Sequence, residues 1–153
     1  MRYMYRKILT GVDGSLESMK ALRSAISLGK TLNASVDVLF VIPPRIYSQL
    51  TEQDVVTPQA DGTTHHISLL QMEENELFEK IRAIATEEGH EVSIHTRIGD
   101  AVEGLVEFTA SHDIDLVVVG SSGKGMAGRL ILGSVSTGVV HQSGVAVLVI
   151  KPD

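Results

Sequence analysis

Residues 115–136 read DLVVVGSSGKGMAGRLILGSVS, and they carry the strongest indication of the fold in the chain. Its apolar run, Leu116–Val119, has the length of a strand and is apolar on both faces, which is typical of a buried strand in a parallel sheet. Glycines follow at once, and Gly133-Ser134 opens a segment, residues 134–142, that we expect to be helical. Open α/β sheets bind their ligands at this edge, beyond the carboxyl ends of the strands.

The rest of the chain alternates between strand and helix patterns. Short apolar runs predict strands at Ile8–Val12, Val36–Ile42, Val92–Ile98 and Val145–Ile150. Apolar residues spaced by three and four predict helices from Ser15 to about Leu32, from Leu70 to near Gly89, and after Asp100. Residues 45–64 have no period and are expected to form a loop. This alternation predicts a single α/β domain over residues 1–153, with a five-stranded parallel sheet and helices on both faces.

Two polar residues are placed to begin helices. Ser15 is expected to cap the first helix, and Asp100 a later one, with Glu103 in the reciprocal position of a capping box. After Ser15, apolar residues follow at helical spacing: Leu16, Met19, Leu22, Ala25 and Ile26.

Composition excludes several classes of function. The 153 residues contain no cysteine, which excludes disulfides, thiolate metal sites and cysteine catalysis. The formal net charge of −6 argues against a nucleic-acid partner, because such proteins usually carry a basic surface. No apolar run approaches the length of a membrane span, so we expect a soluble, cytoplasmic protein without a membrane partner.

The glycine-rich run after Val119 has the properties of an anion cradle. Glycines let the backbone approach a ligand closely, and successive N–H groups in such turns converge on one anion. The helix that starts after Gly133 adds unpaired N–H groups and a favourable dipole, and the hydroxyls of Ser134 and Ser136 add donors. We therefore expect a nucleotide to bind here.

Two familiar nucleotide motifs fit this run poorly. A P-loop needs glycine where Val118 stands and serine or threonine where Gly125 stands. The dinucleotide fingerprint G-x-G-x-x-G is matched by Gly123, Gly125 and Gly128. However, residues 130–133 do not look like a helix that starts at Gly128, and only residues 151–153 follow the strand Val145–Ile150, where the fingerprint needs a further helix, a strand and an acidic residue. We discount both motifs.

A third pattern, G-x-x-G, nine residues and G-[ST], is matched by Gly120, Gly123 and Gly133-Ser134. It is the motif of the nucleotide-binding branch of the universal stress protein family, which the chain resembles. ILTGVDGS (8–15), VLFVI (38–42), DLVVVG (115–120) and VAVLV (145–149) resemble the family's strands, and only residues 43–66 fall outside the pattern. Gly11 stands where proline is commoner, and Gly144-Val145 replaces an Asn-Pro or Cys-Pro pair.

The resemblance implies a Rossmann-like fold of the adenine nucleotide alpha hydrolase type, with strand order 3-2-1-4-5. It also implies that ATP, or another adenine nucleotide, binds at the carboxyl ends of the strands, and that a homodimer forms through the last strand, residues 145–150. The implied nucleotide-binding residues are Gly11, Val12, Asp13, Val41, Gly120, Ser121, Ser122, Gly123, Lys124, Gly125, Met126, Gly133, Ser134, Val135 and Ser136.

Several alternatives stay open. Asp13 either faces the ligand or forms a turn with Gly14 that helps to cap the first helix. Mg²⁺ could accompany ATP, held mostly by phosphates and water. The favoured function is an ATP-binding regulatory or stress-response protein with no catalytic residues and at most weak ATPase activity. The alternatives are a dimerisation module that binds no nucleotide, and an enzyme that hydrolyses ATP or transfers a nucleotidyl group.

Overall fold

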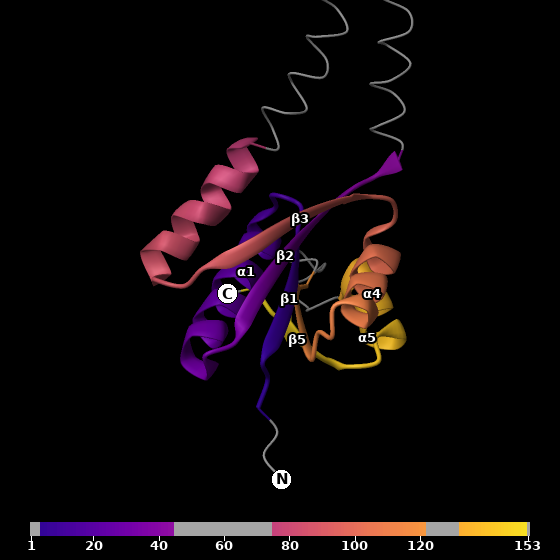
Figure 1. Cartoon of the computed structure of the whole chain (residues 1–153). Coiled ribbons are helices and arrows are strands. Elements are labelled where there is room, and N and C mark those ends of the chain that lie inside the picture. The colour runs from indigo at the N-terminus through magenta and orange to yellow at the C-terminus, as the bar shows by residue number, and fades with distance from the viewer. Residues whose placement is uncertain (1–3, 45–74, 122–131, 153) are drawn as a thin grey trace, which may run out of the picture.

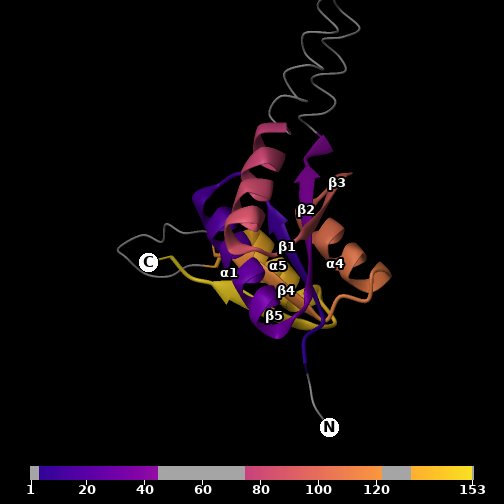
Figure 2. The same cartoon turned by 60° about the vertical axis from the view of Figure 1, so that its left-hand side comes forward.

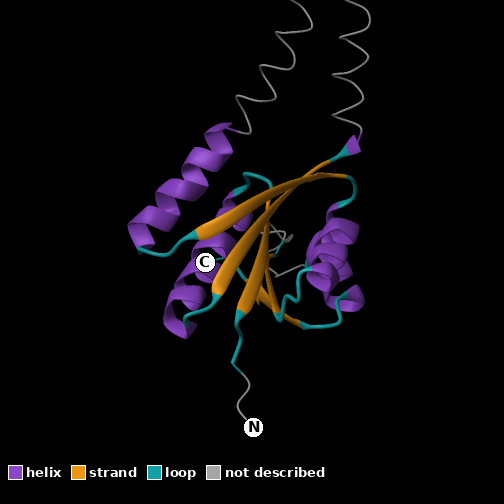
Figure 3. Ribbon diagram, in the orientation of Figure 1, coloured by secondary structure: helices purple, strands orange, loops and turns teal. Residues whose placement is uncertain are grey.

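The computed structural model describes residues 4–44, 75–121 and 132–152. Five parallel strands form one sheet in the order β3-β2-β1-β4-β5, which confirms the expected order (Figures 1 and 3). The strands are β1 (Lys7–Val12), β2 (Ser35–Ile42), β3 (Val92–Ile98), β4 (Leu116–Gly120) and β5 (Ala146–Ile150). The helices are α1 (Leu16–Leu32), α4 (Ala101–Ser111) and α5 (Ser134–Gln142), and residues 75–88 are also helical. This is the predicted Rossmann-like architecture.

The central strand β1 sets the register of the sheet. Thr10 pairs with Val38 on one side and with Val118 on the other. Strand β3 continues beyond β2 at one edge, and β5 continues beyond β4 at the other. Because all the strands are parallel, their carboxyl ends gather at a single edge of the sheet.

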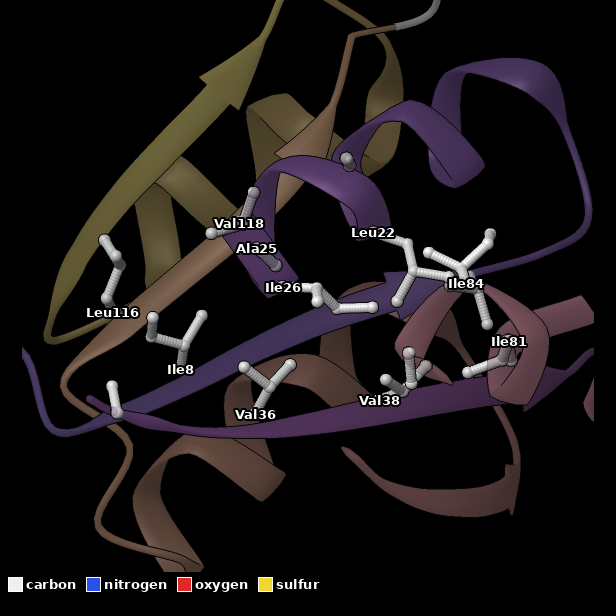
Figure 4. Close-up of a cluster of buried hydrophobic side chains, with 14 of the residues drawn as sticks. Ile8, Leu22, Ala25, Ile26, Val36, Val38, Ile81, Ile84, Leu116 and Val118 are labelled. Carbon is white, nitrogen blue, oxygen red and sulfur yellow. The ribbon is translucent and has the colours of Figure 1, made fainter. Parts of the chain in front are cut away.

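Helices cover both faces of the sheet, so the core has two parts. On one face, α1 and the helix of residues 75–88 pack on the sheet through residues such as Leu22, Ile26 and Ile81 (Figures 2 and 4). On the other face, α4 and α5 pack through Leu105, Phe108 and Val139. Four residues of β4, Leu116–Val119, are buried, as expected for a strand covered on both faces.

Both predicted helix caps are present. The backbone N–H of Ser18 donates to the Ser15 hydroxyl (3.2 Å), and that of Glu103 donates to the Asp100 carboxylate (3.0 Å). Leu16, which begins the run of apolar residues at helical spacing, is 86% exposed and does not belong to the buried face of α1. Leu16 is the first helical residue, and the buried face of the helix begins only at Ser18.

The ends of several elements differ by a residue from the prediction. Strand β1 begins at Lys7, β4 includes Gly120, and β5 begins at Ala146. The loop predicted at residues 45–64 and the start of the predicted helix at Leu70 lie outside the described residues. Within the described ranges, no helix is both long and apolar enough to span a lipid bilayer.

Candidate functional site

A cleft of about 340 Å³ opens at the carboxyl edge of the sheet. Its volume is within the range of small-molecule pockets, about 300–1,000 Å³. The ends of β1, β2 and β4 and the first turns of α1, α4 and α5 surround it. The residues that line it are Gly11, Val12, Asp13, Ser15, Glu17, Ser18, Leu39, Val41, Ala101, Leu105, Val119, Gly120, Ser121, Gly133, Ser134, Val135 and Ser136.

This cleft brings together the predicted site residues that the structure describes. They come from four separate places in the chain: the end of β1, Val41 in β2, the end of β4, and the start of α5. The other predicted residues, Ser122, Gly123, Lys124, Gly125 and Met126, lie outside the described residues.

Asp13 is held in place by the turn that leads into α1. The backbone N–H of Ser15 donates to Asp13 Oδ1 (2.9 Å), and the Asp13 N–H donates to the Ser18 hydroxyl (3.2 Å). Partial burial raises the pKa of Asp13, but hydrogen bonds from the hydroxyl and N–H of Ser15, then from Ser18, outweigh it and leave the pKa below its ordinary value of 3.8. The turn predicted for Asp13 is confirmed, and the carboxylate stays ionised at neutral pH.

The N-terminus of α5 is open to the cleft. Gly133 occupies the N-cap position and has no side chain with which to cap the helix, and no acidic residue stands in the first turn. In contrast, α1 carries Glu17 and α4 carries Glu103 in their first turns. The first N–H groups of a helix have no partner within it and favour an anion. The end of α5 therefore offers donors and a partial positive charge to a ligand.

Gly120 allows the first turn of α1 to approach the end of β4. A Cβ atom at this position would lie 2.6 Å from the carbonyl oxygen of Glu17. Only glycine permits this approach without a shift of the backbone. Gly120 thus has a packing role within the fold, in addition to its place in the glycine motif.

The part of the cleft between β1, β2 and α4 is apolar. Leu39 and Val41 lie on the same face of β2, and Leu105 and Ala101 face them from α4. A Cβ atom on Gly11 would lie 3.1 Å from a methyl carbon of Leu105, so Gly11 lies directly against this wall. Such a lining suits a flat apolar group, for example a nucleotide base.

Several residues that line the cleft were not predicted from the sequence. Leu39 shares a strand face with Val41, and the strand period of two would have revealed it. Ser18 and Glu17 follow the predicted cap Ser15 within one helical turn, so they belong to the same strand-to-helix junction. Nothing in the sequence indicated that Ala101 and Leu105 line the cleft, because neither side chain is a typical ligand-binding group. Within the described ranges, no three metal-binding side chains cluster closely enough to hold an ion.

A model of the universal stress protein family matches residues 4–151. The chain belongs to this family. Universal stress protein MJ0531 of Methanocaldococcus jannaschii is 34% identical over 151 residues, which cover 97% of this chain and 83% of that relative.

Solved structures of universal stress proteins show the same fold. The structure of hypothetical protein MJ0577 aligns with a TM-score of 0.73 and 26% identity over 99% of both chains. A universal stress protein in complex with cAMP aligns with a TM-score of 0.66 and 24% identity, over 97% of this chain and 98% of that one. The binding of cAMP is a property of that protein.

Proposed function

We propose that this universal stress protein binds an adenine nucleotide, ATP foremost, in the cleft at the carboxyl edge of its sheet and acts as a regulatory, stress-response protein. The observation that carries the proposal is the open N-terminus of α5, at Gly133–Ser136. This helix end lines the same cleft as the apolar walls that β2 and α4 contribute. One end of the cleft suits phosphate and the other suits a base.

The phosphate end is supported by the donors there. The backbone N–H groups of Ser134, Val135 and Ser136 belong to the first turn of α5, and all three residues line the cleft. Ser136 is buried, and its hydroxyl donates to the Gly133 carbonyl (3.1 Å), which fixes this turn. A turn held in this way needs little reorganisation to bind an anion.

The base end is supported by its apolar walls. Leu39, Val41, Ala101 and Leu105 present no hydrogen-bonding side chain to a base. Recognition of the base would then depend on backbone groups. A cAMP complex of a family neighbour adds support for adenine.

We expect Mg²⁺ to bind together with the nucleotide, because carboxylates line the cleft. Asp13 and Glu17 line the cleft together with the phosphate end. Two carboxylates repel a triphosphate, and a divalent cation bound to the phosphates would reduce this repulsion. We propose that the triphosphate binds as its magnesium complex, held mostly by phosphates and water.

A homodimer through β5 completes the proposal. Strand β5 is an edge of the sheet, and Leu148 is 39% exposed on it. Apolar, uncovered edges favour pairing with another chain. The acidic net charge and the absence of cysteine fit a cytoplasmic protein that binds no nucleic acid.

Calorimetry with ATP, AMP and cAMP, with and without Mg²⁺, tests the proposal. Wild-type protein should bind at least ATP, and Gly133→Val should abolish binding because its side chain would block the phosphate approach. Gly133 has φ −72° and ψ 174°, values that valine adopts readily, so the variant should keep its fold. Gly144→Val is the matched control, because a Cβ there meets nothing within 4 Å. Equal affinity of wild type and Gly133→Val would contradict the assignment.

A further inference from the structure

Gly138 brings α5 into close contact with α4 on one face of the sheet (Figure 1). A Cβ atom at this position would lie 2.7 Å from one methyl carbon of Val102 and 2.9 Å from the other. Carbon atoms in ordinary contact are about 3.5–4.0 Å apart. Valine has one strongly preferred rotamer in a helix, so the Val102 side chain cannot easily turn away. The two helices therefore lie as close together as a glycine allows.

This contact lies beside two walls of the cleft, although neither Val102 nor Gly138 lines the cleft itself. On α4, Val102 stands between Ala101 and Leu105, which line the apolar end. On α5, Gly138 follows Ser134 by one helical turn, which is about 6 Å along the helix axis. The separation of the helices at this contact therefore sets the distance between the apolar end of the cleft and the first turn of α5.

Of the two helices, α4 is held more firmly. Four of its 11 residues are buried, compared with two of the 9 residues of α5. Gly104 of α4 lies against β2, where a Cβ atom would be 3.1 Å from a methyl carbon of Val41. Arg97 of β3 donates to the Gly104 carbonyl (3.4 Å) and to the Glu107 carboxylate (3.2 Å), which ties α4 to the sheet. A larger side chain at position 138 would therefore displace α5 and leave α4 in place.

We propose that Gly138 is a positioning residue for nucleotide binding. Its contact with Val102 holds the first turn of α5 at the distance from α4 that lets one ligand reach both ends of the cleft. This inference rests on the proposed function and concerns two residues outside both the glycine motif and the cleft lining. A methyl group at the contact would move α5 outward by about 1 Å. Hydrogen bonds from its first turn to a phosphate would then be too long to be strong.

Gly138→Ala should weaken the binding of ATP by about 10-fold or more, as expected when at least one hydrogen bond to a charged group is lost. Adenosine has no phosphate and depends on the apolar end alone, so its affinity should stay that of the wild type. Calorimetry measures the affinity for ATP, and an NMR titration, which detects weak binding, measures that for adenosine.

Substitutions of Val102 test the contact itself. Val102→Ala removes both methyl groups, and the Cβ that alanine keeps lies 3.4 Å from the Cβ position of residue 138. The double variant Gly138→Ala/Val102→Ala should therefore regain the wild-type affinity for ATP, a non-additive effect that residues in direct contact show. Val102→Ile adds a methyl group to the contact from the α4 side. It is the second variant if Gly138→Ala does not fold, and it should also weaken the binding of ATP but not of adenosine.

Gly29→Ala is the matched control for stability. Gly29 lies in α1, away from the cleft lining, and a Cβ atom there would be 2.5 Å from a methyl carbon of Val36. The substitution thus places the same methyl group against a valine from within a helix. Its thermal midpoint should fall by up to about 8 °C once the gain in helix propensity is subtracted, as for Gly138→Ala. Its affinity for ATP should stay that of the wild type.

The outcomes separate the two proposals. Failure of the wild type to bind any adenine nucleotide would overturn the proposed function. Wild-type binding together with an equal affinity of Gly138→Ala for ATP would overturn this inference alone. The inference would also be wrong if the double variant bound ATP no better than Gly138→Ala, if adenosine lost as much affinity as ATP, or if Gly29→Ala weakened ATP binding equally.

Discussion

Gly120 and Glu17 lie so close together that a Cβ atom on the glycine would be 2.6 Å from the glutamate carbonyl oxygen and 2.9 Å from its carbonyl carbon. The contact joins the end of β4 to the first turn of α1, two elements far apart in the sequence. Both residues line the cleft, so the contact helps to set the distance between its walls. The first glycine of the G-x-x-G motif is therefore required by packing even when no nucleotide is bound.

Gly120→Ala should destabilise the protein. The new methyl group would meet backbone atoms, which cannot rotate away, so α1 or β4 must shift. Overpacking of this kind costs about 1–3 kcal/mol of the free energy of unfolding. Urea unfolding followed by circular dichroism measures the change.

Gly144→Ala is the control for that substitution. A Cβ on Gly144 meets no atom within 4 Å, and its backbone does not have a positive φ. This variant should be neutral or up to about 1 kcal/mol more stable, since alanine restricts the unfolded chain. Equal stability of Gly120→Ala and wild type would show that the close approach to Glu17 is not a constraint.

Asp13→Asn should change how the free energy of unfolding depends on pH in the acid range. The pKa of Asp13 is lower in the folded chain than its ordinary value of 3.8. The carboxylate therefore stabilises the fold at pH values above 3.8, and this contribution is lost as the pH falls through the lowered pKa. The difference in the free energy of unfolding between wild type and Asp13→Asn should be largest near neutral pH and should become smaller in acid.

Urea unfolding at a series of pH values, together with an NMR titration of the Asp13 carboxyl carbon, measures this effect. A measured pKa at or above 3.8 would contradict the hydrogen-bonded turn at Ser15 and Ser18.

Leu148→Lys tests the proposed dimer. Leu148 is 39% exposed on the edge strand β5, and a lysine there would place two like charges close together when two such edges pair. Wild type should sediment as a dimer and Leu148→Lys as a monomer. Ile98→Lys is the control, because Ile98 is 48% exposed at the end of the opposite edge strand, β3. A dimer that survives Leu148→Lys but not Ile98→Lys would place the interface at β3.

The sequence predicted the fold well because local signals agreed with one another. The run Leu116–Val119 predicted a buried strand, and Ser15 and Asp100 marked helix starts, and the structure confirms both. The exposure of Leu16 could not be predicted, because helical spacing cannot tell at which residue a helix first reaches the sheet. That depends on the angle at which the chain leaves β1, which is a tertiary property.

The site was predicted less completely than the fold. Gly120, Gly133 and Ser134 belong to a motif, so they were visible in the sequence. Ala101 and Leu105 line the cleft only because α4 packs over β2, and neither residue type signals binding. The close approach of Gly138 to Val102 could not be read from the sequence either, because it depends on how α4 and α5 pack together.

An NMR titration of the ¹⁵N-labelled protein with ATP and Mg²⁺ shows directly whether a nucleotide binds at the start of α5. The backbone amide signals of Ser134, Val135 and Ser136 should shift most, because phosphates bound at the start of α5 would lie against them. The signals of β3 residues far from the cleft, such as Ser93, should not move. An absence of shifts at the start of α5, or shifts centred on another surface, would show that the nucleotide does not bind in this cleft.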